Sequence, residues 1–201
     1  MKGSSDKGKI LKLIRNSLLD KTDILYSNFD LDSDIYTSTK DDPVMVFAES
    51  IINNGGKFIY CKDEKDMLNR LSVLIQNRSW SSQIFSYGDT LNNFLKTNKI
   101  EAKQIGENRP VVGISLCNGI SARNGLITIT SREIKGAKYF KLPEVFVIIA
   151  FTSQIYMDLK TNLNLLTNDM PEFITTLNSN YLLREEIKEL YVFTIENIIQ
   201  T

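Results

Sequence analysis

A run of seven apolar residues, Val145 to Phe151, constrains the fold of this 201-residue chain more than any other feature. The run is far shorter than the roughly 18 residues that a membrane-spanning helix requires. A strand that is covered on both faces has this continuous apolar pattern, and such strands occur mainly in parallel sheets with helices on each side. The run therefore predicts an α/β fold and no membrane span.

The first half of the chain alternates between helical and strand-like patterns. Apolar residues at helical spacing predict helices over 9–19, 43–54, 63–75 and 89–99, and short apolar runs predict strands at 57–61 and 84–87. Pro43 suits the first turn of its helix, and Asp63 is the expected cap of the next one. Under the rules for connections between strands, this order implies a mostly parallel sheet with helices on both faces.

The second half of the chain adds a signal for antiparallel strands. Asn124-Gly125 precedes the alternating residues 126–130, which predicts a hairpin beside the parallel strand expected at 111–116. Thr152 or Ser153 is the expected cap of a helix that continues through Ile155, Leu159, Leu163 and Leu166. Residues 190–195 predict the final strand of the sheet.

The length and the 42% hydrophobic content suit one sizeable core, so we expect a single α/β domain over 43–201. Residues 1–42 are expected to form an amphipathic helix followed by an extended arm. The aromatic residues of this arm can pack on the domain or on a second subunit, which makes a homodimer one of the expected assemblies.

The charges are balanced, with 24 basic and 24 acidic residues. Nucleic-acid binding usually needs a basic field, so nucleic acid is an unexpected partner. Lys9, Lys12 and Arg15 interrupt the apolar residues near the amino terminus, which therefore lacks the continuous core of a secretory signal. We expect a cytoplasmic location.

The chain has two cysteines, Cys61 and Cys117, and no histidine. A zinc or iron–sulfur site needs about four soft or imidazole ligands, so we expect this chain to bind no metal and any cluster to belong to a partner. Cys117 would be a nucleophile only if a nearby cation lowered the pKa of its thiol, and the alternative is a buried structural cysteine.

Basic and hydroxyl side chains flank the predicted hairpin and form the sharpest candidate for a ligand site. Arg123 and Arg132 can bind a carboxylate or phosphate through charge-assisted hydrogen bonds, with Asn118, Ser121 and Ser131 as orienting groups. Two alternatives stay open: Asn118-Gly119 can simply form a turn, and basic residues beside a turn are often only a solvated surface. The pattern assigns no catalytic residue.

The order of motifs in this region resembles that of the LUD domain family, the lactate-utilisation protein C-like proteins. In that family a Gly-x-Ser/Thr-x-Cys loop leads to an Ala-Arg-Thr-Gly-like turn, a Ser-Arg pair and a Leu-Pro step. The matching residues here are Gly113, Ser115, Cys117, Ala122, Arg123, Asn124, Gly125, Ser131, Arg132, Leu142 and Pro143. The resemblance adds the turn residues Asn124 and Gly125 to the candidate ligand-binding set.

The resemblance implies a fold like that of the NagB/RpiA/CoA-transferase group. It also implies a non-cluster subunit of L-lactate oxidation, which binds a small carboxylate or organises a complex whose iron–sulfur clusters lie on partner subunits. The chain departs from the family at 175–189, where it lacks the Gly-Pro-Ser-Arg run and the later Gly-x-His-Gly-Pro turn. The alternative is therefore a degenerate member that acts only as a protein-interaction module, and acyl or CoA transfer ranks last because it rests on fold analogy.

Overall fold

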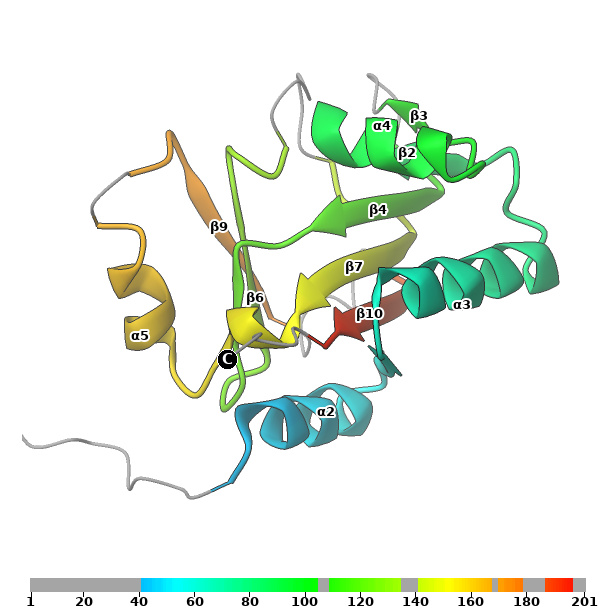
Figure 1. The fold of residues 1–201 in the computed structure, drawn as a ribbon. Helices are drawn as coiled ribbons and strands as arrows, with labels where there is room; N and C mark the ends of the chain where they lie inside the picture. Colours follow the sequence, from blue (N-terminus) through cyan, green and yellow to red (C-terminus); the bar gives the residue numbers. More distant parts are fainter. Residues whose placement is uncertain (1–40, 105–108, 135–140, 168–169, 179–186, 197–201) are drawn as a thin grey trace, which may run out of the picture. The chain divides into compact units, whose positions relative to one another are not determined.

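The computed structural model describes residues 41–104, 109–134, 141–167, 170–178 and 187–196. The predicted helix at 9–19 lies outside these residues, as does nearly all of the predicted arm. The described part of the chain contains two sheets and the helices that pack against them (Figure 1).

The main sheet has six strands, all parallel, in the order β1-β10-β7-β4-β2-β3. Their bounds are β1 Lys57–Cys61, β2 Ile84–Ser86, β3 Lys103–Gln104, β4 Val112–Leu116, β7 Val145–Phe151 and β10 Glu189–Ile195. The seven-residue apolar run is β7, which lies between β10 and β4 and is buried at its first six positions. The predicted α/β class and parallel sheet are confirmed.

The second sheet is smaller and mixed, in the order β8-β5-β6-β9. Its strands are β5 Gly119–Ser121, β6 Leu126–Thr130, β8 Ile155–Tyr156 and β9 Ile174–Asn178. The predicted hairpin is the antiparallel pair β5–β6, and Gly125 in its turn has a φ of 59°, which glycine adopts without strain. The hairpin belongs to this separate sheet, whereas the sequence predicted antiparallel strands next to the parallel ones.

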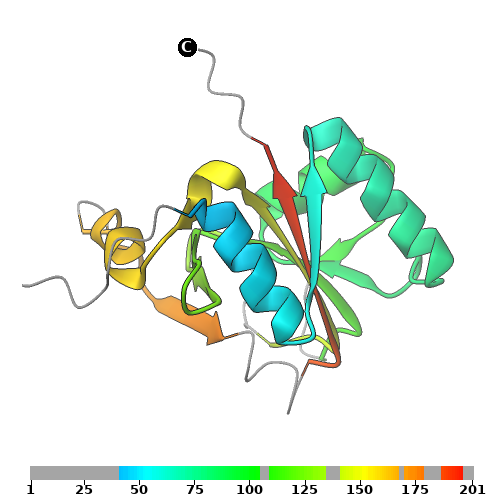
Figure 2. The same cartoon turned by 90° about the horizontal axis from the view of Figure 1, so that it is seen from below.

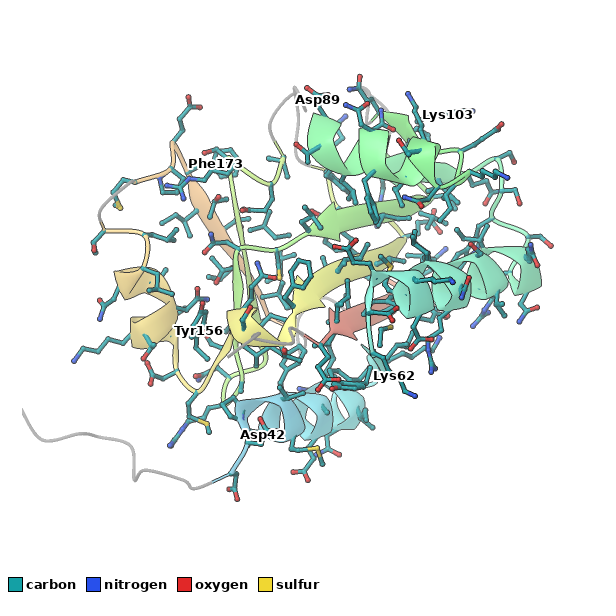
Figure 3. All side chains as sticks on the ribbon, in the orientation of Figure 1. Asp42, Lys62, Asp89, Lys103, Tyr156 and Phe173 are labelled. Carbon is teal, nitrogen blue, oxygen red and sulfur yellow. The ribbon has the colours of Figure 1, made fainter. Side chains whose placement is uncertain are left out.

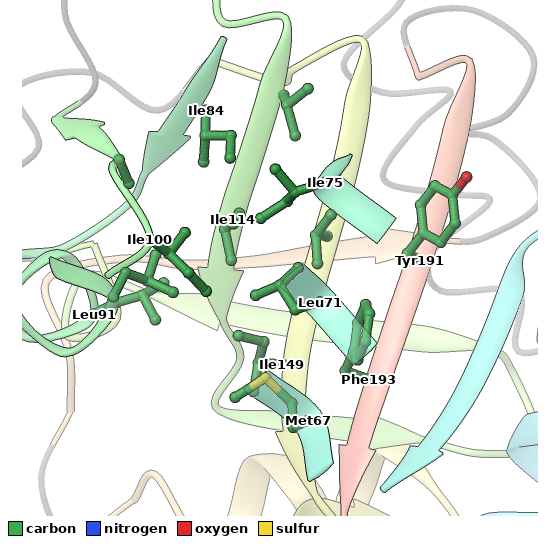
Figure 4. Close-up of a cluster of buried hydrophobic side chains, with 14 of the residues drawn as sticks. Met67, Leu71, Ile75, Ile84, Leu91, Ile100, Ile114, Ile149, Tyr191 and Phe193 are labelled. Carbon is green, nitrogen blue, oxygen red and sulfur yellow. The ribbon is translucent and has the colours of Figure 1, made fainter. Parts of the chain in front are cut away.

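Each face of the main sheet has its own apolar core, because side chains alternate between the faces along a strand. One core joins Phe146, Ile148 and Ala150 of β7 to helix α2 (Pro43–Asn53) and to the inner face of the small sheet. The other core, shown in Figure 4, joins Val147 and Ile149 to α3 (Glu64–Asn77) and α4 (Asp89–Thr97). Figure 2 shows α2 beside the hairpin and α3 on the other side of the main sheet, so helices cover both faces as predicted.

The helix starts have the predicted chemistry. Pro43 is the first residue of α2, and the Asp42 carboxylate caps this helix by accepting from the Val44 amide at 3.0 Å. Asp63 caps α3 by accepting from the Asp66 amide at 2.7 Å. Both carboxylates satisfy amides that have no partner inside their helix.

A helix follows β7, but its predicted start and its predicted cap, Thr152 or Ser153, are wrong. Thr152–Gln154 forms a single 3-10 turn, and Ile155 and Tyr156 then pair with Ile120 and Ser121 of β5 as strand β8. Helix α5 (Leu159–Asn164) begins only at Leu159, with Asp158 as its cap. The helical spacing of Ile155 and Leu159 was misleading because a distant strand supplies the partner of Ile155.

A charged network lies at the amino ends of β1 and β10. Glu189 forms ion pairs with Lys57 and with Arg78, the latter at 3.0 Å, and it accepts from the Tyr191 hydroxyl at 2.7 Å. Burial alone would raise the pKa of Glu189, but the hydrogen bonds from Lys57 and Tyr191 and the two positive charges outweigh it and lower the pKa. Trp80 packs edge-on against Tyr191, with 5.8 Å between ring centroids, and is a core anchor as predicted.

Candidate functional site

The parallel strands of the main sheet all end at one edge, which we call the carboxyl edge. In open α/β sheets, ligands bind beyond this edge. The residues that follow the strands here are Lys62 after β1, Tyr87 after β2, Cys117 and Asn118 after β4, Thr152–Gln154 after β7 and Glu196 after β10.

Gln154 ties together the loops that follow β4 and β7. Its side-chain amide donates to the carbonyls of Cys117 at 2.9 Å and Asn118 at 3.3 Å. Its side-chain oxygen accepts from the Phe151 amide at 2.8 Å. The sequence analysis did not name Gln154 as a site residue, because Cys117 and Asn118 become its neighbours only when β4 and β7 pair.

Asn118 and Gly119 carry the chain directly from β4 into the small sheet. The Asn118 amide donates to the Thr128 carbonyl at 2.8 Å. A Cβ atom on Gly119 would lie 2.3 Å from Oδ1 of Asn162, a fully buried residue of α5. Glycine is needed here for close packing of a helix on a strand, which favours the structural interpretation of the Asn118-Gly119 pair.

Cys117 is a buried thiol, as the structural alternative expected. Its relative exposure is 2%, and burial, followed by the negative charge of Glu133, raises the pKa of the thiol well above its ordinary value. A thiol of this kind is protonated at neutral pH and is a poor nucleophile. Cys61 is also buried, and its pKa is raised to about 11, mainly by burial.

A pocket of about 370 Å³ lies at the carboxyl ends of β1, β10 and β7, beside the amino end of α2. We call it the β1–β10–β7 pocket. Figure 3 labels Asp42 at this end of α2. The residues that line the β1–β10–β7 pocket are Asp42, Pro43, Val44, Tyr60, Thr152, Ser153, Ile155 and Glu196.

The polar groups of this pocket are carboxylates and hydroxyls. Tyr60 hydrogen-bonds to Glu196, and its pKa is raised by burial, by this hydrogen bond and by the negative charges of Glu196 and Asp42. Thr152 and Ser153 add two hydroxyl-bearing side chains to the wall. The arrangement offers hydrogen-bond acceptors and negative charge.

A larger hollow of about 930 Å³ lies between α4 and β3, at the side of the main sheet. Its buried amide, Asn92, has a structural role: oriented to satisfy its neighbours, it donates to the Ala102 carbonyl at 3.0 Å and to the Ser86 hydroxyl at 3.1 Å. This hollow is away from the loops that follow β4, β7 and β10, so we regard the smaller pocket as the better candidate site.

The structure divides the predicted ligand-binding residues into separate groups. Arg123, Asn124 and Gly125 form the hairpin turn, whereas Ser131 and Arg132 follow the other end of β6. At about 3.3 Å per residue, a five-residue strand keeps its ends roughly 13 Å apart, and the two arginines lie beyond those ends. The backbone positions of Arg123 and Arg132 are therefore separated by at least the length of β6.

Asn118, Ser121 and Ser131 differ in burial and in hydrogen bonding. Asn118 is half-buried and its carbonyl accepts from Gln154. Ser121 is fully buried in β5, and its hydroxyl has no hydrogen-bond partner among the described residues. The Ser131 hydroxyl accepts from the Glu172 amide at 3.0 Å, so it holds β9 against the loop after β6.

Two structural observations concern metals and membranes. Within the described ranges, no group of three or more cysteine, aspartate or glutamate side chains is arranged to hold a metal ion. None of the helices that the structure describes is long and apolar enough to cross a membrane.

The fold is that of an α/β protein with a six-stranded parallel sheet, flanking helices and a separate mixed sheet. It is similar to the crystal structure of a DUF162 family protein from Deinococcus radiodurans, with a TM-score of 0.63 and 11% sequence identity. The similarity covers 79% of this chain and 99% of that chain. No family model matches the chain, and no curated protein sequence matches it.

Proposed function

We propose that this chain is a LUD-type subunit that binds a small carboxylate and works beside an iron–sulfur oxidoreductase in lactate oxidation. DUF162 is the LUD-like domain, so the structural similarity agrees with the resemblance in the sequence. The observation that carries the binding role is the half-buried side chain of Arg123, in a hairpin turn that the hydrogen bond from its amide to the Met157 carbonyl fixes.

The family-like motif supports an accessory role because its residues build the core. A Cβ on Gly113 would lie 2.8 Å from both Tyr87 and Pro143, so this glycine allows close packing. Ser115 is buried and donates to the Leu116 carbonyl, and Cys117 is a buried thiol. In this proposal the redox chemistry belongs to the partner subunits, and this chain positions a ligand or the complex.

Arg123 is the better of the two predicted arginines for contact with a carboxylate. Its backbone amide donates to the Met157 carbonyl at 3.2 Å, which fixes the turn, and its side chain is half-buried. Arg132 is exposed at the other end of β6. A fixed, partly desolvated guanidinium binds a carboxylate more strongly than an exposed one.

Reconstitution tests this proposal. The chain would be co-expressed with iron–sulfur subunits of a lactate oxidation complex, and lactate-dependent dye reduction would be measured with and without it. We expect stable co-purification, higher activity with the chain, and loss of the increase in Arg123→Ala but not in the matched control Arg132→Ala. Equal activity with and without the chain would contradict the proposal.

The second candidate is a protein-interaction module, and an exposed apolar segment favours it. Four large apolar side chains are exposed between α5 and the start of β9, a strand at the edge of the small sheet. They are Leu165, Met170, Phe173 and Ile174. Exposed large apolar side chains beside an open strand edge are typical of a protein-binding surface. This candidate predicts that Phe173→Ser removes partner binding while Arg123→Ala leaves it intact.

A further inference from the structure

We propose that the β1–β10–β7 pocket binds a ligand through an ammonium group. This inference goes beyond the proposed role in lactate oxidation and depends on neither lactate nor Arg123. It rests on three features: the sign of the charges that line the pocket, a buried hydroxyl below it, and the register of the strands that brings these groups together.

The register places the relevant side chains on one face of the main sheet. Tyr60 of β1 is the direct neighbour of Thr194 of β10, and Thr194 is the direct neighbour of Ala150 of β7. Leu190 and Val192 point to the face that α2 covers, so Thr194 and then Glu196 point to the same face. Thr194 therefore lies below the part of the pocket that Tyr60 and Glu196 line.

Thr194 is one of the buried polar side chains that lack a hydrogen-bond partner among the described residues, and it lies below this pocket. Its relative exposure is 0%, and its hydroxyl has no hydrogen-bond partner among the described residues. Leaving such a group unsatisfied destabilises the protein, so buried hydroxyls almost always have a partner. Thr194 is not among the residues that line the pocket, so the ligand must enter more deeply, between Tyr60 and Glu196, to supply this partner.

The charge of the pocket selects the ligand. The carboxylates of Asp42 and Glu196 line it, and no basic side chain is among its described lining residues. A carboxylate ligand would meet two like charges, whereas an ammonium group presents a positive charge and several N–H donors. Asp42 already accepts from the Val44 amide, but a carboxylate has about four acceptor positions and keeps capacity for a ligand.

The test uses the purified full-length chain, isothermal titration calorimetry and three probes of defined chemistry. Ethanolamine carries charge and N–H donors, choline carries the charge without N–H donors, and sodium L-lactate carries the opposite charge. We expect ethanolamine to bind, choline to bind at least about tenfold more weakly, and lactate not to compete with ethanolamine.

Two variants locate the binding. Glu196→Gln keeps the shape of the side chain and removes its charge, so we expect ethanolamine affinity to fall at least about tenfold. Thr194→Val removes the buried hydroxyl, and we expect a loss of about fivefold. Glu172→Gln changes an exposed carboxylate that does not line the pocket and should leave affinity unchanged.

The inference is overturned if ethanolamine fails to bind the folded chain, if choline binds equally well, or if Glu196→Gln has no effect. Circular dichroism confirms that each variant is folded. If Thr194→Val does not fold, Tyr60→Phe replaces it, because Tyr60 is 43% exposed and its hydroxyl is not needed for the core. These outcomes are separate from the co-purification assay, so either proposal can fail alone.

Discussion

Replacement of Gly119 by alanine should destabilise the protein through one identifiable contact. The new methyl group would lie 2.3 Å from Oδ1 and 2.8 Å from Cγ of Asn162. Asn162 cannot swing into solvent, because it is fully buried and its Nδ2 donates to the Thr128 hydroxyl at 2.9 Å. Overpacking of this kind typically costs about 1–3 kcal/mol.

A double-mutant cycle isolates this contact. Asn162→Ala alone removes the hydrogen bond to Thr128 and should destabilise the protein by about 1–3 kcal/mol. In that background the amide group of Asn162 that Gly119→Ala would meet is gone. The backbone at position 119 is compatible with alanine, because the described glycines with a positive φ are Gly55, Gly88 and Gly125. The second substitution should then be neutral or slightly stabilising.

Urea denaturation of the four proteins measures the cycle, with the free energy of unfolding taken from the midpoint and slope of each transition. We expect a coupling energy of about 1–3 kcal/mol between positions 119 and 162. Additive effects, with Gly119→Ala equally destabilising in both backgrounds, would refute the argument that Gly119 is required by the approach of α5.

Three further predictions follow from the charged network, the thiols and the core. The pKa of Glu189 is lower in the folded state, so the ionised carboxylate stabilises the protein above about pH 4.3, the ordinary glutamate pKa, and this stabilisation is lost as the pH falls. Urea denaturation between pH 6 and pH 3 should therefore show a smaller decrease in stability for Glu189→Gln than for the wild type. Because the pKa of Cys61 is raised from 9.0 to about 11, the thiolate fraction of Cys61 is about a hundredfold lower than usual. The rate at which a thiol reagent labels Cys61 at pH 8 should therefore equal the rate set by global unfolding, and rapid labelling of the native protein would contradict this. Leu71→Ala in α3 should lower the free energy of unfolding by about 2–5 kcal/mol, because Leu71 is fully buried. Val73→Ala, at a position in the same helix that is 55% exposed, is the control and should change it by less than about 0.5 kcal/mol in urea unfolding.

The sequence predicted those elements whose signal is local. The continuous apolar run gave the bounds of β7, and Pro43 and Asp63 marked the starts of α2 and α3. Each of these signals depends on neighbouring residues in the chain, such as a cap and the amide it accepts from. Local signals are therefore sufficient for these elements.

The elements that the sequence missed depend on distant partners. Strand β8 has only two residues, and it is a strand because β5 lies beside it. Strand β9 exposes much of one face and obtains its register from β6. No local periodicity distinguishes such segments from a helix or a loop.

The candidate pocket was missed for a related reason. Its acidic residues, Asp42 and Glu196, are more than 150 positions apart in the chain and carry no motif. Only the insertion of β10 between β1 and β7 brings them to one face. The two predicted arginines, Arg123 and Arg132, lie beyond opposite ends of β6, a separation that the sequence alone did not indicate.

The position of β10 also affects how the chain folds as it leaves the ribosome. In the main sheet β1 is hydrogen-bonded only to β10, the last described strand to be synthesised. Until β10 is synthesised, β1 has no strand partner among the described strands of this sheet and the nascent chain has no complete core. Pairing of this long range slows folding and leaves strand edges open to aggregation. We therefore expect the native sheet to form only after synthesis of β10 and truncation before β10 to leave β1 unpaired.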